Sequence, residues 1–270
     1  MPPGLSIREK LYFVKECGFD FMEISIDETD EKLSRLDYSE EEINDIINAM
    51  TESNVYIRTM CLSGHRRFPL GSHDESIRRR SLDIMQKAVE FSYRLGIRII
   101  QLAGYDVYYE QSDETTRKLF NENLQKCVSN AALKGIMLGF ETMETPFMDT
   151  VEKSMKYVKQ AGSPYLGVYP DVGNLQNAAV LYGHDIVDDI QKGRGHIFAA
   201  HLKETKPGVY RDMQFGTGHT QYERCVKALY DMGVRIFTGE FWYMGEDDFK
   251  RTLYHANDFL RNKIEKAISA

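Results

Sequence analysis

The apolar positions along the chain follow two patterns, short continuous runs and stretches with helical spacing. Short apolar runs begin near residues 19, 54, 97, 135, 165, 196 and 234, and each follows a Gly or an Asn/Ser-Pro junction. Amphipathic stretches with helical spacing cover residues 7–17, 39–52, 74–95, 114–133, 150–160, 221–232 and 247–268. Apolar runs of this length with turn signals beside them indicate buried strands. The pattern therefore predicts repeated βα units, with parallel strands covered by helices.

The number of predicted strands favours a barrel that lacks one strand. A (β/α)₈ barrel has eight strands, and the pattern predicts seven. Only residues 1–6 precede the first helix, and Pro2-Pro3-Gly4 is unsuited to a strand. A doubly wound open sheet is the alternative, but no Gly-rich phosphate fingerprint follows any strand. With no linker in sight, we expect one α/β domain over residues 1–270, a TIM-like barrel without its first strand.

Charge and cysteine usage narrow the class of protein. The chain has 34 Lys and Arg against 41 Asp and Glu, a net charge of −7, which argues against broad contact with nucleic acid. Its four cysteines are far apart and form no CxxC pair, as is typical of reduced thiols. No apolar run reaches transmembrane length, and the start does not resemble a signal peptide. We therefore expect a cytoplasmic protein that binds neither nucleic acid nor membranes.

Four predicted strands end in residues that bind metal ions. Glu141 closes one strand, Asp171 and Glu240 directly follow two others, and His201 closes a fourth. Because parallel strands of a barrel end at one rim, these side chains would converge. Three carboxylates and one imidazole suit a divalent ion such as Mn²⁺, Mg²⁺, Co²⁺ or Zn²⁺, with positions left for substrate oxygens. For His201 alone, the alternative is a core histidine with satisfied hydrogen bonds.

A second group of residues suits an anionic substrate. Its members are His65, Arg66, Arg67, Lys203, Gly216, Gly218 and Glu23. Arginine forks match phosphate, although residues 65–67 also fit a solvated basic loop. Backbone N–H groups of residues 216–218 would reach a phosphate, unless this GxG is only a turn. Glu23 lies inside a predicted strand, which is unusual unless it faces the barrel interior or its rim.

Six stretches resemble a known family. They are residues 18–31 (GFDFMEISIDETDE), 61–72 (CLSGHRRFPLGS), 101–109 (QLAGYDVYY), 169–174 (YPDVGN), 201–208 (HLKETKPG) and 215–218 (FGTG). These stretches are similar to the L-ribulose-5-phosphate 3-epimerases, also called L-xylulose-5-phosphate 3-epimerases, of the xylose-isomerase-like barrel superfamily. The resemblance covers nearly the whole chain.

The resemblance implies a metal-dependent interconversion of L-ribulose 5-phosphate and L-xylulose 5-phosphate, as in L-ascorbate degradation. It places the metal on Glu141, Asp171, His201 and Glu240, with Zn²⁺ or Mn²⁺ ahead of Mg²⁺ or Co²⁺, and makes Glu141 and Glu240 the acid/base pair. The expected partners are a small sugar phosphate and a second copy in a homodimer. Family members carry a strand before the first helix, and we expect its absence here to reflect either a shortened gene model or a shortened form chosen for expression.

Three alternatives stay open at this point. An aldose–ketose isomerase would move a proton between C1 and C2 of a related sugar phosphate. A truncated barrel would bind sugar phosphate without turning it over. An apurinic-site endonuclease of the same superfamily needs several zinc ions and a basic DNA-binding face, which seven histidines and a net charge of −7 do not favour.

Overall fold

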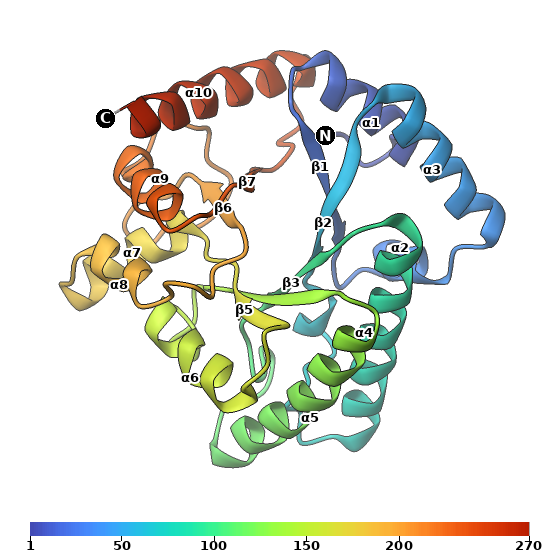
Figure 1. The fold of residues 1–270 in the computed structure, drawn as a ribbon, viewed down its shortest axis with the longest axis vertical. Helices are drawn as coiled ribbons and strands as arrows, with labels where there is room; N and C mark the ends of the chain where they lie inside the picture. The colour runs from blue at the N-terminus through green and yellow to red at the C-terminus, as the bar shows by residue number, and fades with distance from the viewer. Residues whose placement is uncertain (270) are drawn as a thin grey trace.

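The computed structural model describes residues 1–269 as a ring of parallel strands inside a ring of helices (Figure 1). The strands are β1 (Phe21–Ile26), β2 (Tyr56–Leu62), β3 (Ile99–Ala103), β4 (Met137–Glu141), β5 (Leu166–Val168), β6 (Ala200–Lys203) and β7 (Phe237–Glu240). The α-helices are α1 (Ile7–Glu16), α2 (Asp30–Leu33), α3 (Glu40–Ser53), α4 (Glu75–Leu95), α5 (Glu114–Leu133), α6 (Val151–Ala161), α7 (Val172–Tyr182), α8 (Ile186–Gln191), α9 (Tyr222–Asp231) and α10 (Phe249–Ser269). Two 3₁₀ turns cover Ser34–Asp37 and Gly64–Arg66. No helix in this part of the chain is long and apolar enough to cross a membrane.

The strands form two sheets that meet at one junction. Strands β1 to β5 pair in sequence order, all parallel, and β6 pairs in parallel with β7. Isolated parallel bridges from Val168 to Ile197 and from Asp171 to His201 join β5 to the segment that contains β6. Within residues 1–269, no pairing joins β7 to β1. The expected TIM-like barrel that lacks one strand is confirmed.

Local sequence explains where the helices begin and where the core lies. Ser6 and Ser39 cap α1 and α3 in full capping boxes. In β1, Met22, Ile24 and Ile26 point to the helices and are buried, while the residues between them face the barrel. Buried apolar side chains from residue 7 to residue 267 form one continuous cluster between strands and helices.

The structure differs from the predicted elements in the last third of the chain. The span up to Gly193, where the sequence predicts a less regular helical segment, contains two separate helices, α7 and α8. Of the strand expected to begin at residue 196, only Ala200–Lys203 (β6) forms a regular ladder. The residues before it contact β5 through hydrogen bonds between Val168 and the backbone of His196 and Phe198. The reason is that β5 is three residues long and leads into Pro170, which has no N–H to continue a ladder.

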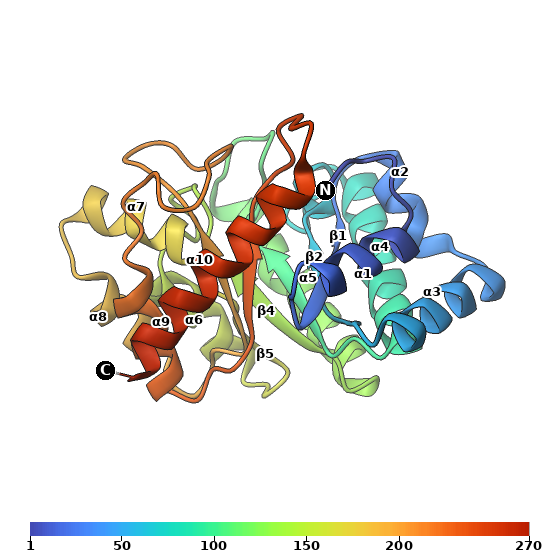
Figure 2. The same cartoon turned by 90° about the horizontal axis from the view of Figure 1, so that it is seen from above.

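A cavity of about 350 Å³ separates the unpaired edges of β7 and β1, and we call it the seam. It is lined by both strands, by α1 and α10, and by Met1. Figures 1 and 2 show the N-terminus at this place, beside the first turns of α10.

Candidate metal centre

The four residues that we expect from the sequence to bind a metal ion lie close together in the structure. Glu141, Asp171, His201 and Glu240 each offer one ligand atom, and these atoms lie within 4.8 Å of one another. Nδ1 of His201 is 3.3 Å from Glu240 Oε2 and 3.9 Å from both Glu141 Oε1 and Asp171 Oδ2. The cluster lies at the carboxyl ends of β4, β5, β6 and β7, where barrel enzymes place their chemistry.

The turn after β5 fixes the orientation of Asp171. Asp171 is the N-cap of α7, and its Oδ1 accepts a hydrogen bond of 2.8 Å from the N–H of Asn174. A Cβ on Gly173 would come within 2.7 Å of the carbonyl oxygen of Lys203, so only glycine lets this turn lie against β6. Capping thus uses one oxygen of Asp171 and leaves Oδ2 facing the cluster.

Burial sets the proton affinity of the carboxylates. Burial and the charge of Glu240 raise the pKa of Glu141 to about 8. Burial also raises the pKa of Asp171 to about 7, against the opposing charge of Lys203. Burial would raise the pKa of Glu240 as well, but Lys203 and His201 outweigh it and hold that pKa well below its usual range. Burial therefore favours the protonated forms of Glu141 and Asp171, whereas Glu240 stays ionised beside Lys203 and His201.

The unsatisfied atoms of the cluster fit a divalent cation. Asp171 Oδ2 and Glu240 Oε2 are buried and accept no hydrogen bond of acceptable geometry. Nζ of Lys203 lies 3.1 and 3.3 Å from these two oxygens, close enough for ion pairing but poorly aligned for hydrogen bonding. Two orphaned carboxylate oxygens beside an imidazole nitrogen form an oxygen-rich donor set for a hard or borderline divalent ion.

Glu23 holds the other nitrogen of His201. Its Oε1 lies 2.6 Å from His201 Nε2, and its Oε2 accepts hydrogen bonds from Thr59 at 2.6 Å and from Tyr169 at 3.0 Å. The Tyr169 hydroxyl is also 2.7 Å from Thr238 Oγ1. The expectation that Glu23 faces the barrel is confirmed, and its carboxylate contacts His201, Thr59 and Tyr169 in this structure.

Three buried residues that are not among the site residues expected from the sequence complete this network. Thr59 donates to Glu23, Gln101 Nε2 lies 3.1 Å from His201 Nδ1, and the ring of Tyr169 lies 4.9 Å from that of His201. Thr59 and Gln101 interrupt predicted apolar strands with a polar residue, which is the one signal that marked them in advance. Tyr169 gave no such signal, because an aromatic residue at a strand end is ordinary core material.

The basic loop after β2 divides into three different environments. His65 is buried, its Nε2 lies 3.2 Å from the carbonyl oxygen of Ser81, and burial lowers its pKa to about 4. Arg67 is exposed and pairs with Asp30 at 2.8 Å. Arg66 lies over the rings of Tyr105 and Tyr108, and its Nε is buried without a hydrogen-bond partner. Of the three, Arg66 alone combines partial burial with a free donor.

The loop that contains Gly216 and Gly218 is held in place by the buried carboxylate of Glu204. The N–H of Gly216 donates to Glu204 Oε2 at 2.7 Å, and Thr220 N–H donates to the other oxygen at 3.2 Å. A Cβ on Gly218 would come within 2.1 Å of the carbonyl oxygen of Thr205, so this glycine is needed for close packing. In this structure the N–H of Gly216 therefore donates to Glu204, so it is not available to a phosphate.

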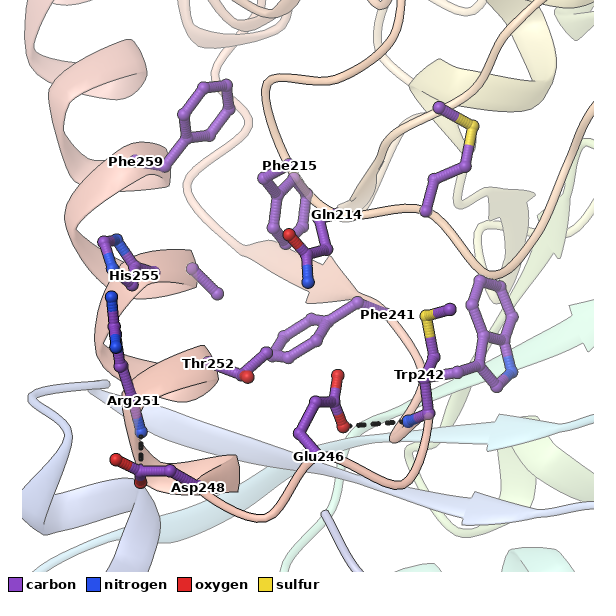
Figure 3. Close-up of a pocket in the computed structure, with 13 residues that line it drawn as sticks. Gln214, Phe215, Phe241, Trp242, Glu246, Asp248, Arg251, Thr252, His255 and Phe259 are labelled. Carbon is purple, nitrogen blue, oxygen red and sulfur yellow. Dashed lines mark hydrogen bonds between the residues drawn. The ribbon is translucent and has the colours of Figure 1, made fainter.

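A second cavity of about 480 Å³ lies between α10 and the loops that follow β6 and β7 (Figure 3). Phe215, Phe241 and Phe259 give it aromatic walls, and Arg251 and His255 line it from α10. Trp242 lines this cavity and also lies 5.8 Å from Nζ of Lys203. The loop after Glu240 therefore separates the metal centre from this cavity.

Comparison with known proteins agrees with this architecture. Residues 11–263 match the family described as Xylose isomerase-like TIM barrel. The chain is 41% identical over 268 residues to L-ribulose-5-phosphate 3-epimerase UlaE of Escherichia coli O139:H28 (strain E24377A / ETEC), covering 99% of this chain and 93% of that protein. The resemblance drawn from the six sequence stretches is confirmed.

Solved structures with lower identity share the fold. D-psicose 3-epimerase from Clostridium cellulolyticum H10 superposes with a TM-score of 0.80 at 18% identity, covering 96% of this chain and 94% of that chain. An L-ribulose 3-epimerase superposes with a TM-score of 0.77 at 18% identity, covering 97% and 90%. Together with the family match over most of its length, these results show that the chain belongs to the xylose isomerase-like TIM barrel family.

Proposed function

We propose that this protein is an isomerase that inverts C3 of a ketopentose phosphate, interconverting L-ribulose 5-phosphate and L-xylulose 5-phosphate. The observation that carries the proposal is the placement of Glu141 and Glu240 in one buried metal-binding cluster, on separate strands of the barrel. The 41% identity to a protein named L-ribulose-5-phosphate 3-epimerase supports this choice of reaction.

The reaction needs two carboxylates and a means of stabilising negative charge. The proton on C3 is adjacent to the C2 carbonyl, so its removal gives an enediolate. One glutamate takes this proton from one face, and the other returns a proton to the opposite face, which inverts C3. Exchanging these roles runs the reaction in the other direction, and no redox cofactor is required.

A divalent ion held by Glu141, Asp171, His201 and Glu240 would supply Lewis acidity at the C2 and C3 oxygens. Zn²⁺ and Mn²⁺ are our first candidates, followed by Mg²⁺ and Co²⁺. Lys203 is buried with its ammonium group between Asp171 and Glu240, where it adds positive charge near the developing oxyanion. Asp171 and His201 hold the ion, and they take no part in proton transfer.

We assign Glu23 to positioning His201. Its bond to Nε2 favours the tautomer that carries the proton on that nitrogen, which leaves the Nδ1 lone pair directed toward the carboxylates. Thr59 and Tyr169 in turn fix the carboxylate of Glu23. This role replaces the direct substrate contact considered for Glu23 from the sequence.

Arg66 is our first candidate for the phosphate. Its partly buried guanidinium keeps Nε free, and its nearest carboxylate, Glu28, is 3.6 Å away. Replacing Arg66 with Gln should raise KM for the phosphate ester about tenfold or more, the value of one charged hydrogen bond, and leave turnover of the free pentulose unchanged. Arg67→Gln is the matched control. If Arg66→Gln and Arg67→Gln raised KM for the phosphate ester equally, the assignment of Arg66 to phosphate binding would be wrong.

The function is tested directly by incubating metal-loaded protein with L-xylulose 5-phosphate and following the products by NMR. L-Ribulose 5-phosphate is the expected product. An aldose phosphate would instead identify an aldose–ketose isomerase. Calorimetric binding of the sugar phosphate with no conversion would identify a barrel that binds without catalysing, and would refute the proposal.

A further inference from the structure

The cavity between α10 and the loops after β6 and β7 has the size of a small-molecule site. Its volume of about 480 Å³ lies within the range in which proteins bind small ligands, roughly 300–1,000 Å³. One face of α10, residues 213–215 and the loop that follows Glu240 line it (Figure 3). None of the four residues of the candidate metal cluster lines this cavity, so it is a separate space.

Aromatic rings form the apolar part of the cavity. The rings of Phe215 and Phe259 are stacked, with centroids 5.7 Å apart and planes at 22°, and Phe241 meets Phe215 edge-on at 5.5 Å. Trp242 adds a fourth aromatic side chain to the lining. All four are only partly buried, so they keep surface for a ligand. Walls of this kind favour a planar ring, which stacks on one of them or meets it edge-on.

Two hydrogen-bond donors on α10 line the same cavity and have no partner. Arg251 and His255 are four residues apart, so their side chains lie on one face of the helix. In the described part of the chain, no ion pair or side-chain hydrogen bond involves either of them. Lys250, Arg261 and Lys263 on the same helix, by contrast, all pair with carboxylates. Arg251 and His255 are therefore free to donate to a ligand.

The two carboxylates beside these donors bind the backbone of their own loop. Asp248 Oδ1 accepts a hydrogen bond of 3.1 Å from the main-chain N–H of Arg251, and Glu246 Oε2 accepts one of 2.9 Å from the N–H of Met244. Both bonds hold the segment that leads into α10, and neither involves the guanidinium of Arg251. An anionic group on a ligand would supply a counter-ion to this guanidinium, whose planar donors match a carboxylate or a phosphate.

We propose that this cavity binds a small ligand that combines a planar aromatic ring with an anionic group, either a phosphate or a carboxylate. The ring contacts Phe241 and Trp242, and the anion pairs with Arg251 and accepts a hydrogen bond from His255. The site is separate from the metal centre, and the proposal does not depend on the reaction that the barrel catalyses.

The experiment uses adenosine monophosphate as the probe, because it has both an aromatic ring and a phosphate. Trp242 is the only tryptophan of the chain and lines the cavity, so its fluorescence reports on a ring bound there. The probe should change this fluorescence saturably. Adenosine lacks the anion and ribose 5-phosphate lacks the ring, so each should bind at least about tenfold more weakly. Anilinonaphthalene sulfonate, followed by its own emission, is a second aromatic anion that should bind saturably.

Variants test whether the probes bind in the cavity. Arg251→Gln should weaken the binding of both probes about tenfold or more, the value of one charged hydrogen bond. Arg79→Gln, which removes an exposed arginine from α4, is the matched control and should leave binding unchanged. Arg66→Gln, which alters the basic loop after β2, should also leave it unchanged.

Three outcomes would overturn the proposal. The first is that neither probe binds saturably. The second is that ribose 5-phosphate changes the fluorescence of Trp242 at the same concentrations as adenosine monophosphate, since binding would then need no aromatic ring. The third is that Arg251→Gln binds both probes as tightly as the unmodified protein does, or that Arg66→Gln weakens binding equally, since the probes would then lie outside this cavity.

Discussion

The two sheets border each other at two places around the barrel, and only one of these places is bridged. At the β5–β6 junction, bridges from Val168 to Ile197 and from Asp171 to His201 join the sheets. At the seam between β7 and β1, residues 1–269 contain no bridge, and a cavity takes the place of a strand. Asp171 and His201, two of the four residues in the candidate metal cluster, are the two partners of one bridge at the closed junction.

The difference shows that the site does not need an uninterrupted ring of strands to assemble. Asp171 and His201 are held by a cap, a bridge and buried packing that are all local to the closed junction. Glu240 and Glu23 reach the same cluster from the two strands that border the seam. We therefore expect the closed junction to be rigid. We expect substitutions along the seam to alter the site by moving Glu23 or Glu240.

The largest expected effect concerns the acid/base pair, which has one member on each side of the closed junction. Glu141→Gln or Glu240→Gln should each lower epimerisation about 10²–10⁴-fold, and excess metal should not restore it. In D₂O, each variant should still exchange the C3 proton of one epimer without inverting it. NMR of C3 deuterium with both epimers measures this, and exposed Glu152→Gln is the control. Near-normal epimerisation in both variants would end the catalytic assignment.

Metal removal should test whether an ion clamps the closed junction. Because an ion that binds only the folded state stabilises it, metal at about 100 times its Kd should add about 2.7 kcal/mol to the free energy of unfolding. A chelator should lower Tm by removing this term, and Asp171→Asn should make Tm nearly insensitive to chelator. Differential scanning calorimetry measures both, with exposed Asp231→Asn as the control. If the chelator left the Tm of the unmodified protein unchanged, the assignment of a metal site to this cluster would be wrong.

Glu23 tests whether the seam side supports the metal centre. Glu23→Gln keeps the shape but weakens the bond to His201 Nε2, so metal affinity should fall about 10–100-fold. Isothermal titration with Zn²⁺ or Mn²⁺ measures this without using activity. Asp20→Asn, which removes an exposed charge from the same seam, is the matched control. Equal affinity in the two variants would leave Glu23 without a positioning role.

The smallest expected effect is a difference in hydrogen-exchange rate between the closed junction and the seam. The amides of Val168, Phe198 and His201 donate across the closed junction at 2.8–3.0 Å. They should exchange at least about tenfold more slowly than the outer amides of residues 21–26 and 237–240. Mass spectrometry or NMR resolves these segments. Equal protection would show that the seam edges are already covered in solution.

Particular residues show how far the sequence alone could reach. The convergence of Glu141, Asp171, His201 and Glu240 was predictable because parallel strands bring their ends to one rim, so position along the chain implied proximity in space. His65 and Gly216 show the limit of that argument. Both lie in loops with suitable donors, but one is buried against Ser81 and the other is bonded to Glu204. Loop conformation depends on contacts with distant segments, and a local sequence pattern does not specify it.

The sequence by itself determined the order of strands and helices, the seven-stranded barrel and the residues that gather at its rim. These follow from periodicity and from the parallel arrangement that βα units impose. Only the tertiary structure decided that Glu23 binds His201, that Arg66 keeps a free donor, and that Lys10 and Met1 border an open seam. Those facts depend on side chains that are far apart in the chain and meet only when the strands and helices pack together.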